Sequence, residues 1–404
     1  MLEKSLLVLV LSATLCVTLF SASARADWFA YVVNSYPGDE TLSKINLSTD
    51  EVVNDIDILG ASPNQIVIQG DLAYVVNSLD HDIQIIDLKT ETTVDWINIG
   101  EPRNPFHLAF VNSQYAYVTN LMTNTISKVD AIDKTVVGEF AVGQAPEGLL
   151  VVGNKLYVCC TGFEWSKYKR IAGREWVFDL THRANDVKAY SYIPGKVYVF
   201  DTQSDSVTDS ISVGINPQYL AIDAGGELNV VCTGDYWSVF GQICRINPIA
   251  NTVIDSIATG GSPGIISIGT DGIGYLAAGG WHPDPGLVYT FDSDADTVLR
   301  GSSNPITTHS GVIAVAAFPS TKARSNVYTC NYQADDVTLL TPKGDLMKTY
   351  LLGNGPVSIE FYQRPYQGPL LDSMGVIILV VLLILSGSLI LIRKRNLKVD
   401  RRFP

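Results

Sequence analysis

The chain has 404 residues, of which 47% are hydrophobic and 17% are charged, and its formal net charge at pH 7 is -13. The first 26 residues carry +1 and the residues after Ile392 carry +5, which leaves -19 for the body between them. A body this acidic repels a phosphate backbone, so no nucleic-acid partner is expected. Cations, sugars, peptides and basic protein faces remain as classes of ligand.

The N-terminal segment predicts export. An apolar run from Leu6 to Phe20 is followed by Ala24-Arg25-Ala26, which has the A-x-A form of a secretory cleavage site. We expect residues 1–26 to be a signal peptide and the mature chain to begin at Asp27. An uncleaved signal anchor is the alternative, but the apolar run is short for a membrane span.

A short strand pattern recurs seven times in the body. The intervals between copies are 40 to 53 residues, except for one of 72, and one four-stranded propeller blade has this length. Period-two alternation of β-branched residues between glycine and proline turns predicts strands throughout. The copies start at Tyr31, Tyr74, Tyr117, Tyr157, Asn229, Tyr275 and Tyr328.

The order of the strands predicts a closed ring. The body, residues 27–363, starts at Trp28 in the second strand of a blade and ends at Gly355 to Gln363 with the pattern of an innermost strand. The last strand therefore completes the first blade, which leaves no open sheet edge. We predict an all-β fold, a seven-bladed β-propeller of four-stranded blades.

The asparagines that end four of the repeated strands have the type and position of turn formers. An asparagine side chain accepts a hydrogen bond from the backbone two residues further on, and this Asx turn suits the end of a strand. We expect Asx turns at Asn34, Asn77, Asn120 and Asn331.

The repeats "YVVN" and "YVTN", with the turn "VG-x-x-P", resemble the YVTN family of bacterial and archaeal β-propellers over nearly all of residues 28–363. The resemblance implies a fold more than an activity. Members of that family resemble surface-layer proteins, and related propellers include lactonases and quinoprotein dehydrogenase subunits.

The C-terminal segment predicts a membrane anchor. Residues 374–392 are almost purely apolar and uncharged, and 19 residues at 1.5 Å rise match the bilayer core. The basic residues of 393–404 are retained on the cytoplasmic side, so one transmembrane helix would place the propeller in the periplasm or on the cell surface.

The linker before this helix, residues 364–373, contains a possible sorting motif. The stretch "GPLLDSMG" resembles the sorting tails of the IPTL and PEP type, which a membrane sortase reads. Pro369, Leu371 and Gly375 match that pattern, whereas Ser373 and Met374 replace the usual Glu-Trp. A plain membrane anchor is the alternative, and both remain open.

One rim of the propeller collects the candidate binding residues. In the predicted strand order, the loops between second and third strands and the loops between blades lie on the same rim. Aromatic faces beside acids suit sugars, peptides or cationic ligands, although tryptophans also pack long loops onto a rim. The candidates for this ligand-binding rim are Trp165, Trp176, Trp237, Trp281, Glu164, Asp235, His107 and His309.

Blade four carries an insertion, residues 163–196, with a net charge of +3 on the acidic body. A long loop inside a compact repeat is often functional. Its many aromatic residues predict an ordered cap, because disordered segments contain few of them.

The histidines suggest a metal site, for which the candidates are His107, His309, His81 and His282. Ligands must converge at about 2 Å from a metal, and residues spread over a wide ring rarely do so. We therefore predict no cofactor, while leaving a divalent metal open. Five cysteines follow the signal segment, and buried packing is the favoured interpretation, with a Cys232 to Cys244 bridge as the alternative.

The chain has no nucleophile motif, haem motif or phosphate-binding loop, so no catalytic residue is predicted. The expected function is a non-catalytic binding or scaffold module, exported and tethered to a membrane, that holds a protein, peptide or glycan. One alternative is an extracytoplasmic enzyme of the lactonase or quinoprotein dehydrogenase subunit type. The other is a passive component of the cell surface coat.

Overall fold

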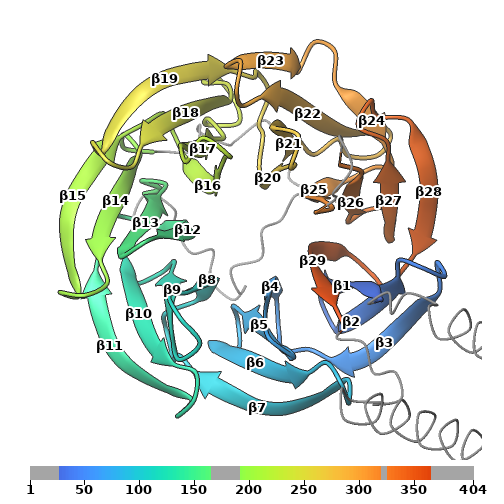
Figure 1. The fold of residues 1–404 in the computed structure, drawn as a ribbon, viewed down its shortest axis with the longest axis horizontal. Coiled ribbons are helices and arrows are strands. Elements are labelled where there is room, and N and C mark those ends of the chain that lie inside the picture. The colour runs from blue at the N-terminus through green and yellow to red at the C-terminus, as the bar shows by residue number, and fades with distance from the viewer. Residues whose placement is uncertain (1–26, 165–191, 320–324, 365–404) are drawn as a thin grey trace, which may run out of the picture. The chain divides into compact units, whose positions relative to one another are not determined.

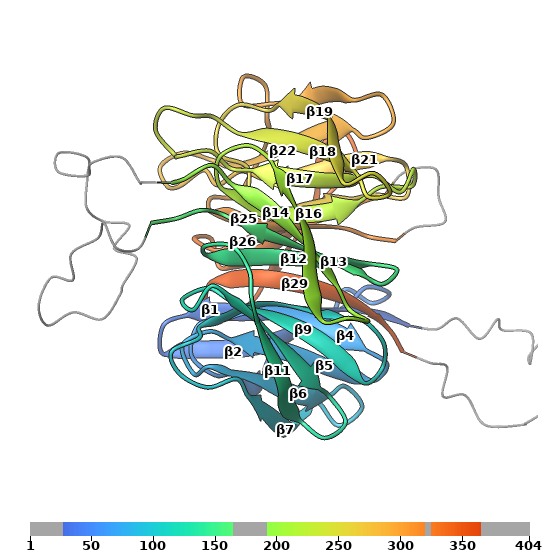
Figure 2. The ribbon, with the colours of Figure 1, turned by 90° about the vertical axis from the view of Figure 1, so that its left-hand side faces the viewer.

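The computed structural model describes residues 27–164, 192–319 and 325–364. Seven antiparallel sheets stand around a common axis, so the predicted seven-bladed propeller is confirmed (Figure 1). Figure 2 shows the ring edge-on, with the loops between strands on two opposite sides. We call the strands of a blade A to D, from the axis outward.

The first four blades each consist of four strands. Blade 1 contains β29 (Pro356–Gln363), β1 (Trp28–Tyr36), β2 (Asp39–Asn46) and β3 (Val52–Ile58). Blade 2 contains β4 (Pro63–Gln69), β5 (Leu72–Asn77), β6 (Asp82–Asp87) and β7 (Thr92–Asn98). Blade 3 contains β8 (Pro105–Phe110), β9 (Tyr115–Asn120), β10 (Thr125–Asp130) and β11 (Thr135–Ala141). Blade 4 contains β12 (Pro146–Val152), β13 (Lys155–Cys160), β14 (Lys196–Asp201) and β15 (Ser206–Ser212).

Blades 5 and 7 have four strands each, whereas the sheet of blade 6 has five. Blade 5 contains β16 (Pro217–Ile222), β17 (Leu228–Cys232), β18 (Gln242–Asn247) and β19 (Thr252–Ala258). Blade 6 contains β20 (Ile266–Ile268), β21 (Ile273–Ala277), β22 (Gly286–Asp292), β23 (Thr297–Arg300) and β24 (Ile306–Thr308). Blade 7 contains β25 (Val312–Ala317), β26 (Val327–Asn331), β27 (Asp336–Leu340) and β28 (Leu346–Leu351). The short strands β23 and β24 pair with successive parts of β22, so the outer edge of blade 6 is split in two.

The ring closes through β29. This strand pairs with β1 at the N-terminal end of the propeller, as the repeat order predicts. The N–H of Ser35, near the end of β1, donates to the carbonyl of Gly355 at 2.8 Å, which ties the end of strand B of blade 1 to the residue before its A strand. The first and last strands therefore complete a single blade, in which β1 pairs with β29 on one side and with β2 on the other.

The rim formed by the B-to-C and D-to-A loops, which we call the B–C rim, is fixed by a repeated backbone bond. The residue after strand B donates its N–H to the carbonyl of the residue that precedes strand A. This residue has a positive φ, 52° at Asn104 and 58° at Asn216, and a proline follows it. The bonds are Leu121 to Asn104 (3.0 Å), Thr161 to Ala145 (3.1 Å) and Thr233 to Asn216 (2.9 Å).

The opposite rim, formed by the A-to-B and C-to-D turns, joins each blade to the next through side chains. We call it the C–D rim. In blades 1, 3 and 4, the tyrosine near the start of the repeated motif donates its hydroxyl to the C-to-D turn of the following blade. These bonds are Tyr31 to Glu91 (3.3 Å), Tyr157 to Asn251 (3.1 Å) and Tyr117 to Asp205. Lysines of the same blades reach the same turn residues, as Lys128 does with Asp205 at 2.7 Å.

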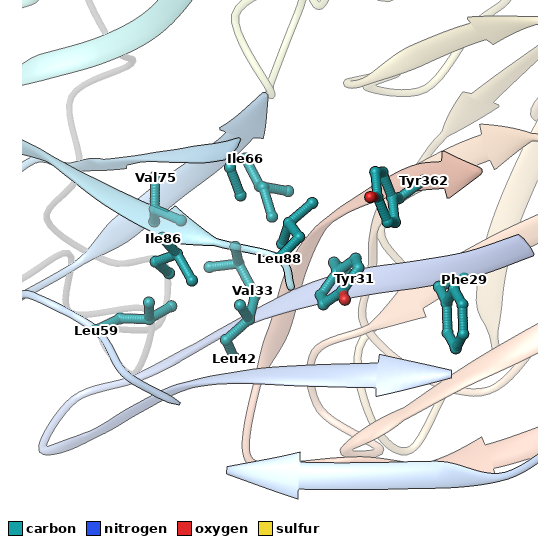
Figure 3. Packing of buried hydrophobic residues seen from close by; sticks show 11 residues of the cluster. Phe29, Tyr31, Val33, Leu42, Leu59, Ile66, Val75, Ile86, Leu88 and Tyr362 are labelled. Carbon is teal, nitrogen blue, oxygen red and sulfur yellow. The ribbon is translucent and has the colours of Figure 1, made fainter. Parts of the chain in front are cut away.

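The core is divided among the junctions between blades. Seven clusters of buried hydrophobic residues lie at the seven junctions. Figure 3 shows the cluster between blades 1 and 2, where Val33 of β1 and Ile66 of β4 approach Ile86 of β6. Each fully buried side chain of this size contributes about 1.5–3 kcal/mol, so the blades are stable as neighbours rather than alone.

The expected Asx turns at the repeated asparagines are wrong. Each of the four side chains is 0% exposed and donates its Nδ2 across to strand C of the same blade. Asn120, for example, donates to Oγ1 of Thr125 and Oγ of Ser127, both at 2.9 Å. Its Oδ1 is buried and has no hydrogen-bond partner among the described residues, whereas an Asx turn requires that oxygen as the acceptor.

The five cysteines of the propeller are free and buried. Sγ of Cys232 donates to Sγ of Cys244 at 3.7 Å, so the two form a thiol pair and not a bridge. This hydrogen bond lowers the pKa of Cys244 to about 6.

The predicted signal segment, the anchor at 374–392 and the sorting residues Pro369, Leu371 and Gly375 lie outside the described residues. Within the three described ranges, no helix is long and apolar enough to cross a membrane.

Candidate functional site

The B-to-C loop of blade 5 is held in a fixed conformation by Asp235. Its Oδ1 accepts the backbone N–H groups of Trp237 (2.9 Å), Ser238 (2.6 Å) and Val239 (2.7 Å), and the Ser238 hydroxyl donates to Oδ2. Partial burial disfavours the charged carboxylate, but these four donors outweigh it and hold the pKa of Asp235 well below its usual range. Asp235, which the sequence analysis places among the ligand-binding residues of the rim, therefore stabilises the conformation of its own loop.

Gly234 allows the loop to adopt the conformation in which Asp235 accepts these hydrogen bonds. Gly234 has a φ of +86°, and a Cβ at this position would lie 2.0 Å from the carbonyl oxygen of Val239. A larger residue would push the loop open, because this backbone conformation and this contact both require glycine. The loop is thus specified by its sequence, "GDYWSVFG".

The loop that Asp235 stabilises exposes large apolar side chains to solvent. Trp237 is 71% exposed, Phe240 63% and Tyr236 47%. The loop from Tyr236 to Phe240 is called the aromatic loop below. Apolar side chains gathered on one exposed loop are typical of a surface that a partner covers.

Blade 6 adds a second exposed tryptophan to the same rim. Trp281 is 41% exposed, and its ring lies edge-on to Tyr332 of blade 7, with centroids 6.3 Å apart. The next residue, His282, donates its backbone N–H to Oε1 of Gln333 at 2.6 Å. Two of the four predicted rim tryptophans are therefore exposed on adjacent blades.

The other two predicted tryptophans, Trp165 and Trp176, lie outside the described residues. The two ends of the insertion in blade 4 are described and meet on the rim. Phe163 and Tyr192 form an antiparallel bridge with ring centroids 5.3 Å apart, and Nε2 of Gln144 donates to the carbonyl of Phe163 at 2.7 Å. Glu164 follows Phe163 at the edge of the described range.

The predicted histidines do not come together. Nδ1 of His81 accepts the N–H of Asn104 at 3.0 Å, and Nδ1 of His309 lies 2.5 Å from Oδ2 of Asp336 at the start of β27. His282 is exposed, and His107 lies near the axis. Among the residues that the structure describes, no three or more histidine, cysteine or acidic side chains could hold a metal ion together.

An axial pocket of about 140 Å³ lies at the B–C end of the inner strands. Figure 1 shows these seven strands around the centre of the ring. The ring of His107 stacks on Phe106 and lies 5.4 Å from Tyr219 of blade 5, centroid to centroid in both cases. The pocket is lined by Asn64, Phe106, His107, Tyr219, Ile265, Ile313 and Val357.

Burial controls the titratable groups around this pocket. It lowers the pKa of His107 to about 4, so the imidazole is neutral at pH 7. It raises the pKa of Glu147 to about 8, and Oε2 of Glu147 is buried without a hydrogen-bond partner among the described residues. Burial, and then the Glu147 carboxylate, raise the pKa of Tyr219 above its usual range.

The sequence predicts His107 but not Glu147 or Tyr219. All three belong to the first three residues of an A strand, one or two positions after its proline. A comparison of these two positions across the seven blades would have found Glu147 as the one acid among them. The signal is faint because six blades contribute only one or two residues each to the lining of the pocket.

Comparisons with known proteins identify the fold. No family model matches the chain, and no curated protein matches its sequence. Hydrazine synthase from Kuenenia stuttgartiensis shares 14% identity over 76% of this chain and 96% of that chain, with a TM-score of 0.58. A candidate 6-phosphogluconolactonase from Bacteroides fragilis shares 11% identity over 84% and 99%, with a TM-score of 0.62. A functionally unknown protein from Desulfotomaculum acetoxidans shares 13% identity over 83% and 99%, with a TM-score of 0.58.

At these identities the likeness concerns the fold alone. The chain has the fold of a seven-bladed β-propeller.

Proposed function

We propose that this chain is an exported propeller, tethered to a membrane through residues 374–392, that binds a protein partner with the aromatic loop of blade 5. The observation that carries the proposal is the exposure of Trp237 and Phe240 on a loop that Asp235 has already ordered. Binding then costs little conformational entropy, because the loop does not need to be ordered by the partner.

The chemistry of the loop favours a protein partner over a glycan. Sugar recognition needs polar side chains beside the aromatic face. In this loop both oxygens of Asp235 accept hydrogen bonds from the loop itself, and the side chains of Val239 and Phe240 are apolar. Exposed tryptophan, tyrosine and phenylalanine side chains are typical of the energetic centres of protein interfaces.

Site-specific photo-crosslinking in intact cells tests the proposal. A photoreactive phenylalanine derivative replaces Trp237, and in a matched control it replaces Trp96, which is 53% exposed on the outer strand β7 of blade 2. We expect a discrete protein adduct from position 237 and none from position 96. Equal crosslinking at both positions, no adduct at 237, or an adduct that contains glycan without protein would refute the interface.

The tether is tested separately by fractionation. The full chain should remain with membranes after alkaline extraction, and a chain that ends at Gln363 should be released into the soluble exported fraction. Cleavage near Leu371 would indicate sortase processing in place of a plain anchor. Release of the full, uncleaved chain would contradict the tether while leaving the aromatic loop untouched.

A further inference from the structure

The last residue of the repeated motif is joined to strand C by a pair of polar side chains in several blades. In blades 1, 3 and 7 an asparagine amide donates to a hydroxyl that lies two positions beyond the asparagine's direct partner in strand C. These pairs are Asn34 with Ser43, Asn120 with Ser127 and Asn331 with Thr338. In blade 5 the same two positions hold Cys232 and Cys244, because Cys232 pairs directly with Gln242. Blade 5 therefore carries two thiols where these three blades carry an amide and a hydroxyl.

The two sulfur atoms of blade 5 are already in contact. The Cys232 thiol donates to Sγ of Cys244 at 3.7 Å, and the Ser256 hydroxyl of β19 donates to the same sulfur at 3.5 Å. A disulfide bond is about 2.05 Å long, so the two sulfur atoms need to approach each other by about 1.7 Å. Gly214 leaves room for the pair, since a Cβ there would lie 3.1 Å from Sγ of Cys232. The side chains that a disulfide would join are therefore neighbours in the folded ring.

The hydrogen-bond donors around Cys244 favour its thiolate. The Cys232 thiol, the Ser256 hydroxyl and the Gly214 N–H lower the pKa of Cys244 to about 6, although burial opposes them. The same thiol–thiol contact, and then burial, raise the pKa of Cys232 above its usual range. Because the thiolate is the nucleophilic form of cysteine, Cys244 is the sulfur that attacks an oxidant, and Cys232 is the thiol beside it that can complete a disulfide.

The pair belongs to blade 5 alone among the described residues, where no other two cysteines share a hydrogen bond. Cys160 occupies the equivalent position in blade 4, at the end of β13, but the residue diagonally across from it is Tyr198. Burial raises the pKa of Cys160 above its usual range, so its thiol stays protonated. Cys160 is therefore a matched control for Cys232.

The thiol pair stands at the base of the aromatic loop. Cys232 is the last residue of β17 and Cys244 lies in β18, so the segment between them contains the exposed side chains of Trp237 and Phe240. A bond between the two sulfur atoms would close this segment covalently. The two cysteines are only 1% and 2% exposed, so the oxidant has to be small.

We propose that Cys232 and Cys244 are a modification site at which a small hydroperoxide forms a reversible disulfide that closes the base of the aromatic loop. With hydrogen peroxide, the Cys244 thiolate attacks one oxygen, the O–O bond breaks, and the departing hydroxide takes a proton from solvent to become water. Cys244 is then a sulfenic acid. The Cys232 sulfur attacks Sγ of Cys244, the S–O bond breaks, and the hydroxide leaves as water with the thiol proton of Cys232.

This step reduces one hydrogen peroxide to two waters and oxidises two thiols to one disulfide. Closure of the loop does not depend on what the loop binds.

Peptide mass spectrometry of the full chain tests the proposal. The reduced, folded chain is treated with hydrogen peroxide, denatured in an alkylating reagent and digested. We expect residues 232 and 244 to be joined, and the other propeller cysteines, Cys159, Cys160 and Cys330, to be alkylated. Dithiothreitol should restore all the thiols.

Three serine variants separate the roles of the two sulfur atoms. Cys232→Ser should stop at the sulfenic acid of Cys244, which dimedone traps, and Cys244→Ser should slow the oxidation of Cys232 about tenfold or more. The control Cys160→Ser should leave both the bond and its rate within about twofold of the parent chain. Serine retains a polar group at a position that is polar in other blades, and equal urea midpoints of the reduced chains would show that all three variants fold.

Stability gives a second readout. The oxidised chain should unfold at a higher urea concentration than the reduced chain, because the bond restricts the unfolded state, and Cys232→Ser should abolish this difference. A disulfide that includes Cys159, equal oxidation of all the cysteines, or no bond in the folded chain would overturn the proposal. Photo-crosslinking at position 237 reports the partner and not the bond, so a failure of either proposal leaves the other testable.

Discussion

Tyr117→Phe tests whether the repeated tyrosine holds the ring together. The Tyr117 hydroxyl of blade 3 donates to Asp205 in the C-to-D turn of blade 4, and the side chain is 0% exposed. A hydrogen bond to a charged group contributes about 1.5–3 kcal/mol. Asp205 keeps its ion pair with Lys128 at 2.7 Å, so the loss should fall near the lower end, about 1.5 kcal/mol.

Blade 2 offers a matched control. Tyr74 occupies the same position of the repeat and is 4% exposed, but the equivalent turn residue of blade 3 is Lys134, which pairs with Asp95. The Tyr74 hydroxyl has no acidic partner in the described part of the chain. Tyr74→Phe should therefore change the free energy of unfolding by less than about 0.5 kcal/mol, because removing an unpaired buried hydroxyl is nearly neutral.

Urea unfolding of the propeller measures both variants. The midpoint should fall for Tyr117→Phe at an unchanged slope, and the midpoint for Tyr74→Phe should match that of the parent chain. If both variants shift the midpoint equally, the tyrosine contributes through its ring alone, and the inter-blade hydrogen bond has no measurable value.

Two further predictions concern the described ring. Asn120→Ala should destabilise the propeller by about 1–3 kcal/mol in urea unfolding, because Thr125 and Ser127 lose a buried donor; unchanged stability would contradict its role across strands. Lys89 and then Tyr362 lower the pKa of Asp71 below its unfolded value, so the stabilising contribution of Asp71 is present above about pH 4 and is lost as the pH falls through the lowered value. Asp71→Asn should cost about 0.5–1 kcal/mol at pH 6, and this cost should diminish as the pH falls below about 4. A cost independent of pH would refute the ionic part of the contact.

The fold follows from the sequence because its information is local and repeated. Strand alternation marks each blade, and Gly-x-x-Pro turns precede five of the seven A strands. The position of the A strand at Gly355 to Gln363 fixes the closure through β29. The asparagines were misjudged for a physical reason. Their type and position suit an Asx turn, but the facing strand C offers hydroxyl and acidic partners, as Thr125 and Ser127 do for Asn120.

The candidate sites were predicted unequally. The sequence draws attention to the aromatic loop because Asp235 and Trp237 are close together along the chain. It does not predict that Asp235 accepts hydrogen bonds from its own loop. The pocket depends on residues such as Phe106 and Tyr219, which are more than a hundred positions apart and meet because seven blades converge. No sequence pattern shows that these residues come together in the fold. A single residue such as His107 identifies only one member of the pocket lining.

The two rims of the ring differ in how much change they tolerate. On the C–D rim, turn residues such as Glu91, Asp205 and Asn251 accept bonds from the preceding blade, so a change there weakens a junction. On the B–C rim the loops vary from residues 78–81 in blade 2 to residues 161–195 in blade 4. The backbone bond that anchors them recurs in every blade except blade 6, where Ala278 donates to Leu287. Because that bond uses main-chain atoms, the side chains of the loops are free to differ between blades. A recognition surface can therefore arise on the B–C rim without loss of ring stability, and both the aromatic loop and the axial pocket lie at that end of the strands.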